Sequence, residues 1–131
     1  MQKNKGIISF IHSFYQAFLP ALNGIALAWE SERSFRIHVS AILLVSMGGI
    51  GFGLDTKEWA IVFLTYAVLT GLELLNSAIE SLANYVQPEE HPAMKRAKDL
   101  AAGAVLCAAI FAVAIGILLF LPKILQHLSQ A

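Results

Sequence analysis

Two long stretches of this chain carry no charged side chain. They comprise residues 37–54 and 100–122 and are 18 and 23 residues long. A helix needs about 20 mainly apolar residues to cross a lipid bilayer, so each stretch is long enough for one span. The pattern predicts membrane-spanning helices at about 34–54 and 96–121.

A third apolar segment lies between these two and is interrupted by polar groups. Its first part, residues 59–72, is uncharged, and apolar side chains at helical spacing continue as far as Val86. We predict one helix over about 58–86, joined to the first span by a short loop at 55–58.

The first 30 residues follow a different pattern, in which apolar and polar side chains are sorted onto two faces. On a helix, the polar side chains of this segment fall within an arc of about 100°. This predicts an amphipathic helix at about 7–30 that lies on the membrane surface and is broken or kinked near Pro20. The alternative is a signal peptide, because Lys3 and Lys5 precede an apolar run and residues 26–28 resemble a cleavage site. The core of a signal peptide is apolar on all sides, so the sorted polar arc favours the surface helix.

The composition agrees with a small integral membrane protein. Of the 131 residues, 57% are hydrophobic and 14% are charged, whereas soluble domains carry about 25% charged residues. The nine basic and nine acidic residues argue against disorder and against nucleic-acid binding. The single cysteine, Cys107, excludes a disulfide framework and a cysteine-based zinc site. We therefore expect a single domain over 1–131 of the all-α integral membrane class, with three spans and one surface helix.

The basic residues predict the orientation of this three-span arrangement. Cytoplasmic loops are enriched in Lys and Arg. Only Lys57 and Lys123 lie on one side of the predicted membrane. The other seven basic residues lie on the opposite side: Lys3, Lys5, Arg33, Arg36, Lys95, Arg96 and Lys98. We predict a multi-pass protein of the bacterial cytoplasmic membrane, with a cytoplasmic N-terminus and a cytoplasmic loop at 87–98.

The second predicted span carries a stripe of polar side chains. Glu73, Asn76, Ser77, Glu80 and Asn84 fall within about 60° of one another on a helix. Ionisable groups at membrane depth are costly and usually mark a functional site. The alternative is a structural seam in which polar side chains join neighbouring helices, and two glutamates on one stripe favour function over that alternative.

Further polar residues gather at the predicted cytoplasmic edge. Carboxylates, lysines and an asparagine suit Mg²⁺ and phosphate, because hard oxygen ligands hold the metal while Lys neutralises phosphate charge. The histidines lack the spacing of a transition-metal site. The residues of this group are Glu32, Arg33, Arg36, His38, Glu89, Glu90, His91, Lys95, Lys98 and Asp99.

The glycine-rich segment 48–53 resembles a phosphate-binding loop only superficially. It lacks the Walker pattern and lies at the predicted outer end of the first span. Gly49 and Gly53 have the spacing of small residues at a close helix contact, which predicts that both pack against a neighbouring helix.

Several motifs together resemble the bacterial diacylglycerol kinase and undecaprenol kinase family. The resemblance covers residues 13–123 and is carried by Glu-Leu-Leu-Asn-Ser-Ala-Ile-Glu at 73–80, His-Pro at 91–92 and Arg-Ala-Lys-Asp-Leu-Ala-Ala-Gly-Ala-Val at 96–105. Glu-Arg-Ser-Phe-Arg-Ile-His at 32–38 is similar to the entrance of the first span in that family. The resemblance implies a small three-span homotrimer that phosphorylates a lipid alcohol with ATP and Mg²⁺ and has no P-loop.

The resemblance also implies roles for individual residues. Glu73 would be the general base, Glu32 and Glu80 would hold the metal ions on ATP, and Asn76 would order the site. Asn84 departs from the family, which usually carries Asp at this position. The expected nucleotide contacts are Glu32, Glu80, Glu89, Glu90, His91, Lys98 and Asp99.

The nature of the lipid is left between two candidates. Segments 32–38 and 120–125 look more like the undecaprenol kinase branch, and His38 stands where the diacylglycerol branch tends to be acidic. We therefore expect undecaprenol, with diacylglycerol as the alternative.

Two other classes of protein would also fit parts of the pattern. One is a small proton-coupled exporter, which uses one membrane-embedded glutamate, and the other is a structural subunit without activity. Because three spans are too thin to enclose a site, we also expect active sites shared between subunits.

Overall fold

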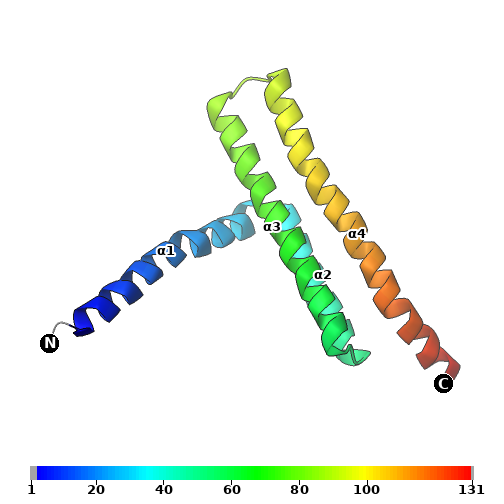
Figure 1. Ribbon diagram of the computed structural model, residues 1–131. Helices are drawn as coiled ribbons and strands as arrows, with labels where there is room; N and C mark the ends of the chain where they lie inside the picture. The colour runs from blue at the N-terminus through cyan, green and yellow to red at the C-terminus, as the bar shows by residue number, and fades with distance from the viewer. Residues whose placement is uncertain (1–2, 131) are drawn as a thin grey trace. The chain divides into compact units, whose positions relative to one another are not determined.

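The computed structural model describes residues 3–130, and this part of the chain contains helices and no strand (Figure 1). The helices are α1 (Lys3–Ser31), α2 (Arg33–Gly51), α3 (Thr56–Val86) and α4 (Pro92–Gln130). The predicted all-α class and the order of its four helices are confirmed. The chain divides into two compact units, one ending at Glu32 and the other beginning at Arg33.

The first unit is the single helix α1, which runs without interruption through Pro20. A break at Pro20, one of the two predicted forms, is therefore wrong, and the other form, a kink there, stays a prediction. A proline removes one backbone donor and crowds the preceding turn, but α1 continues for more than two turns on either side of it. The remaining hydrogen bonds keep both halves helical. Side chains such as Phe18 and Leu22 are more than half exposed, as expected for a helix whose apolar face is covered by lipid rather than by its own chain.

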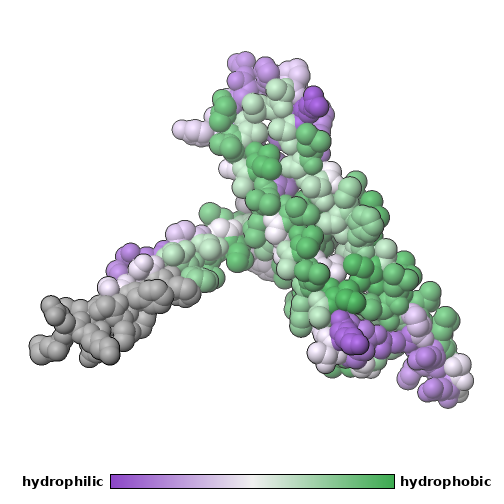
Figure 2. Space-filling model, viewed as in Figure 1, coloured by the Kyte–Doolittle hydropathy of each residue, from purple (hydrophilic) through white to green (hydrophobic). Residues whose placement is uncertain are grey.

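The second unit contains three helices that are long and apolar enough to cross a membrane. Most of their large apolar side chains point outward, and Leu118 of α4, for example, is 74% exposed. The surface in Figure 2 shows this as a hydrophobic band over α3 and α4, with hydrophilic residues at the two ends. Exposed apolar surface on this scale belongs in a lipid environment. The chain is a multi-pass membrane protein.

A tight hairpin connects α2 to α3. Gly53 adopts a φ of 65°, a left-handed conformation that glycine accepts without steric cost. Asp55 then caps α3 and accepts hydrogen bonds from the backbone N–H groups of Lys57 and Glu58, at 2.7 and 2.9 Å. The Glu58 carboxylate accepts the Asp55 N–H in return, at 2.7 Å. This capping box fixes the start of α3 at Thr56.

The two glycines predicted to share a helix contact play separate roles. A Cβ atom on Gly49 would lie 2.8 Å from the Leu54 side chain and 2.9 Å from the Trp59 ring. Close packing of the hairpin therefore requires a glycine at position 49. Gly53 lies in the loop, and nothing comes within 4 Å of the place where its Cβ would be. The predicted packing role is wrong for Gly53, which serves the turn instead.

Helix α3 is the central element of this unit. It runs antiparallel to α4, to which the loop after Val86 connects it, and α2 packs along part of its length (Figure 1). The Tyr66 hydroxyl donates a hydrogen bond to the Ile42 carbonyl at 3.1 Å and so joins α3 to α2. At the far end, the Lys123 ammonium lies 3.0 Å from the Glu58 carboxylate and joins α4 to the start of α3.

Candidate active site

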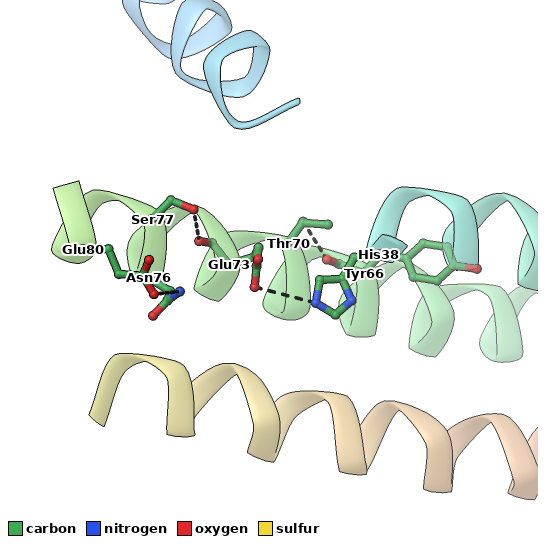
Figure 3. A network of polar contacts seen from close by, with 7 residues as sticks. All are labelled: His38, Tyr66, Thr70, Glu73, Asn76, Ser77 and Glu80. Atoms are coloured by element: carbon green, nitrogen blue, oxygen red, sulfur yellow. Dashed lines mark hydrogen bonds and ion pairs between the residues drawn. The ribbon is translucent and has the colours of Figure 1, made fainter. Parts of the chain in front are cut away.

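Glu73 lies in the middle of α3 and is almost completely buried, with 3% of its surface exposed. Its nearest basic group is His38 of α2, whose Nε2 lies 3.6 Å from Glu73 Oε2 (Figure 3). A buried carboxylate is costly unless a partner compensates its charge or its lost hydration. The structure therefore pairs the expected base with a histidine that was not among the predicted site residues.

Not every polar side chain on α3 is available to a substrate. The Ser77 hydroxyl donates to the Glu73 backbone carbonyl at 3.0 Å, and the Thr70 hydroxyl donates to the Tyr66 carbonyl at 2.7 Å (Figure 3). Serine and threonine in helices commonly satisfy their hydroxyl groups in this way. Without Ser77, the polar stripe retains Glu73, Asn76, Glu80 and Asn84.

Asn76 and Glu80 form a second polar pair one turn further along α3. Asn76 Nδ2 donates to Glu80 Oε1 at 3.1 Å, and in Figure 3 both side chains point from α3 toward α4. The amide oxygen of Asn76 is buried and accepts no hydrogen bond within the described residues. An unsatisfied buried oxygen normally has an explanation such as a missing ion or ligand. Amide and carboxylate oxygens are ligands that Mg²⁺ prefers, so this pair fits the predicted metal role of Glu80 and the ordering role of Asn76.

A hollow of about 500 Å³ lies where α3 turns into α4. Five of the predicted nucleotide contacts line it: Glu89, Glu90, His91, Lys98 and Asp99. Asn84 and Lys95 line it as well. The hollow begins within one turn of Glu80, because Ala83 and Asn84 form part of its wall.

Two contacts hold the lysines of this hollow. The Lys98 ammonium donates to the Asn84 amide oxygen at 3.1 Å, so the asparagine orients this lysine across the α3–α4 pair. The Lys95 ammonium lies 2.6 Å from the Asp99 carboxylate, one turn further along α4. Both lysines therefore stay at the rim, where an anion could replace or share these contacts.

Glu32 is the one predicted site residue outside the second unit. It follows the last residue of α1, and its carboxylate accepts a hydrogen bond from the Ser31 hydroxyl at 3.2 Å. Its metal role stays a prediction. Within the described residues, no three Asp, Glu, His or Cys side chains gather closely enough to hold a metal ion by themselves. Mg²⁺ bound to a nucleotide requires only one or two protein carboxylates, because phosphate oxygens and water complete its shell.

An apolar cavity of about 250 Å³ extends between α2, α3 and α4. Small and apolar side chains such as Ala41, Val45, Ala112 and Gly116 form most of its wall. His38 lines the cavity and also contacts Glu73, so the apolar space and the buried carboxylate share one residue.

His38 and Lys95 belong to the polar group at the predicted cytoplasmic edge, but neither was assigned a role at the site from the sequence, for different reasons. His38 is the one residue with an ionisable side chain group between Arg36 and Asp55, and that isolation was a usable signal. Its partner could not be read from the sequence, because packing of two helices brings them together. Lys95 looked like an ordinary membrane-flanking lysine, and only the geometry of the hollow distinguishes it.

A buried acid within a span and a lysine-lined hollow at a helix turn define a membrane protein with a polar site near one membrane face. Residues 20–120 match the family model described as prokaryotic diacylglycerol kinase. The chain is 40% identical to an undecaprenol kinase of Bacillus subtilis over 87% of its own length and 93% of that protein. It is also 40% identical to a diacylglycerol kinase of Synechocystis, over 84% of this chain and 63% of that protein. A diacylglycerol kinase of Escherichia coli is 33% identical over 69% of this chain and 74% of that protein.

The chain belongs to the prokaryotic diacylglycerol kinase family. It is a lipid kinase, as the motifs at 73–80 and 96–105 implied. The family assignment favours a phosphotransferase over the exporter and the structural subunit.

Proposed function

We propose that this protein phosphorylates undecaprenol to undecaprenyl phosphate, with ATP as donor and Mg²⁺ as cofactor. The observation that carries the proposal is the buried Glu73 carboxylate within a membrane span, beside an apolar cavity and near a lysine-lined hollow. A lipid alcohol can reach such a carboxylate from the bilayer, while a nucleotide can reach the hollow from water.

Undecaprenol is preferred to diacylglycerol on two grounds. The undecaprenol kinase relative aligns over nearly all of its own length. In addition, segments 32–38 and 120–125 look more like the undecaprenol kinase branch of the family, and His38 stands where the diacylglycerol branch tends to be acidic. Because diacylglycerol kinases also match this chain, diacylglycerol is the alternative substrate.

In the proposed reaction the lipid hydroxyl attacks the γ-phosphorus of ATP directly. Glu73 accepts the hydroxyl proton while the new oxygen–phosphorus bond forms, and the bond to the bridging oxygen breaks to release ADP. Glu73 ends the reaction protonated and returns its proton to water before the next turnover. No covalent intermediate on the protein is required, so most of the acceleration comes from positioning the reactants.

The nucleotide is assigned to the hollow between α3 and α4. Lys98 and Lys95 would neutralise phosphate charge there, and Glu89, Glu90, His91 and Asp99 would contact the remainder of ATP. Glu80, with the Asn76 amide oxygen beside it, and Glu32 would hold Mg²⁺. When bound, Mg²⁺ supplies neutralisation of the charge on the transferred phosphoryl group.

The assembly and the membrane sidedness are part of the same proposal. We assign the protein to the bacterial cytoplasmic membrane with its N-terminus inside, because seven of nine basic residues lie on that side of the spans. We further propose a homotrimer in which neighbouring subunits share each site. The three spans of one chain are too thin to enclose a site by themselves, which supports this assembly.

Phosphoryl transfer can be tested directly with the purified protein in detergent. The assay supplies labelled ATP, Mg²⁺ and either undecaprenol or diacylglycerol, and the lipid products are separated by chromatography. We expect label in undecaprenyl phosphate, and Glu80→Gln should abolish it without disturbing assembly. Glu58→Gln, on the same helix but at its other end, is the matched control and should stay active. Faster labelling of diacylglycerol would overturn the choice of substrate, and normal turnover of Glu80→Gln would exclude its metal role.

A further inference from the structure

The chemistry of the two side chains decides which would donate and which would accept in the contact between His38 and Glu73. His38 Nε2 faces the Glu73 carboxylate at 3.6 Å, slightly beyond hydrogen-bond distance. A carboxylate only accepts hydrogen bonds, so an imidazole that donates to it from Nε2 carries a proton on that nitrogen. This fixes the tautomer of a neutral imidazole, and it holds equally for the imidazolium. Polar contacts of catalytic groups are often long in structures without substrate and shorten once the site is filled.

His38 reaches Glu73 in surroundings that hold little water. The His38 side chain is 17% exposed and that of Glu73 is 4% exposed, so water screens the contact little. The α4 residues beside His38 in the cavity, Ala109 and Ala112, are uncharged. On α3 itself, Tyr66 donates to a backbone carbonyl of α2, and Glu80 accepts from Asn76.

We propose that His38 is a positioning residue for the general base: its Nε2–H orients the Glu73 carboxylate beside the apolar cavity. The inference rests on the proposed function of Glu73. A buried carboxylate without a partner is costly, and a partner that holds one of its oxygens leaves the other oxygen available to the hydroxyl of the lipid. Because His38 also lines the cavity, a lipid chain seated there brings its hydroxyl to the side of Glu73 that the imidazole leaves free.

Two substitutions at position 38 separate this role from simple packing. His38→Leu fills the space without an N–H donor, whereas His38→Gln keeps a donor on a side chain of similar reach. With saturating ATP and undecaprenol, we expect His38→Leu to lower kcat by at least about 10-fold, since general-base catalysis is worth roughly 10²–10⁴-fold. The KM for ATP should stay unchanged. His38→Gln should recover a large part of the lost kcat.

A matched control addresses the possibility that His38 only holds α2 against α3. Ser46→Ala removes the contact between the Ser46 hydroxyl of α2 and the Tyr66 hydroxyl of α3, 3.4 Å apart, which joins the same two helices, and Ser46 does not line the cavity. We expect its kcat to stay within about twofold of the native value, because such a contact between helices contributes to stability and plays no part in proton transfer.

Three outcomes would overturn the inference: a His38→Leu enzyme with native kcat, equal losses in the Leu and Gln variants, or a loss in Ser46→Ala as large as that in His38→Leu. If His38→Leu does not assemble, His38→Gln still decides, because it should keep a large part of the native kcat. A Gln variant as inactive as Glu73→Gln would contradict the role. Failure of the native protein to label any lipid alcohol would instead refute the proposed function.

Discussion

At the scale of single residues, Asn84 shows how a site can keep a contact when the type of residue differs from the one that the family usually carries. The family resemblance made this asparagine a departure, because an aspartate usually stands there. In the structure its amide oxygen accepts the Lys98 ammonium at 3.1 Å. The oxygen atom, rather than the negative charge, is what orients the lysine, and asparagine supplies one.

Substitution of Asn84 tests that explanation. Asn84→Asp keeps an oxygen for Lys98, so we expect activity within about threefold of native. Asn84→Ala removes it, and because a hydrogen bond to a charged group is worth about 1.5–3 kcal/mol, we expect the KM for ATP to rise several-fold with little change in kcat. Initial rates at varied ATP measure both. Equal KM values in the two variants would show that Lys98 needs no orienting partner.

The candidate site residues on one helix were accessible to sequence reasoning, and their partners were not. Glu73, Asn76 and Glu80 follow helical spacing, so their shared face could be predicted from periodicity alone. The pairing of Glu73 with His38 depends on how α2 packs against α3, and periodicity within one segment carries no information about that packing. The Lys98–Asn84 contact across α3 and α4 escaped prediction for the same reason.

At the scale of elements, the hairpin between α2 and α3 depends on a close approach at Gly49. The sequence suggested that Gly49 and Gly53 act together, yet only Gly49 lies against its neighbours, while Gly53 supplies the turn. Spacing alone could not make this distinction, because the helix ends at Gly51, two residues before the second glycine. The continuation of α1 through Pro20 could not be predicted either, because a proline weakens a helix without always ending it.

Alanine substitutions in this hairpin should have unequal effects. Gly49→Ala places a methyl group within 3.0 Å of Leu54 and Trp59, and such overpacking costs about 1–3 kcal/mol. We expect a lower midpoint of thermal unfolding in detergent. Gly51→Ala is the control, because nothing lies within 4 Å of its new Cβ, and its midpoint should be unchanged or higher. Equal midpoints for the two variants would contradict the close packing at Gly49.

At the scale of the whole molecule, the predicted sharing of sites between subunits follows from how few polar side chains one chain encloses by itself. Glu73 is the single buried charged residue of the described chain, and the hollow proposed for the nucleotide is open to one side. Glu32 ends the first unit, whereas the other proposed site residues lie in the second. A neighbouring subunit could therefore complete each site.

Mixing of inactive chains tests this sharing. Glu32→Gln and Glu73→Gln should each be inactive alone. If a site takes Glu73 from one chain and Glu32 from its neighbour, random co-assembly of equal amounts should restore about a quarter of native activity, because a trimer is a closed ring of identical contacts. Activity is measured after the two chains exchange subunits in detergent. No recovery, with exchange verified by differently tagged chains, would place both glutamates in the same chain.

The burial of Glu73 inside a membrane helix has a consequence for how this enzyme meets its substrate. An alcohol that never leaves the lipid phase encounters the protein by diffusion in two dimensions. Its effective concentration is then its mole fraction among the surrounding amphiphiles, and the volume of the solution is irrelevant. Diluting the lipid with inert detergent at constant total amount would slow the enzyme, whereas diluting the whole sample with buffer, at saturating ATP, would leave each turnover unaffected.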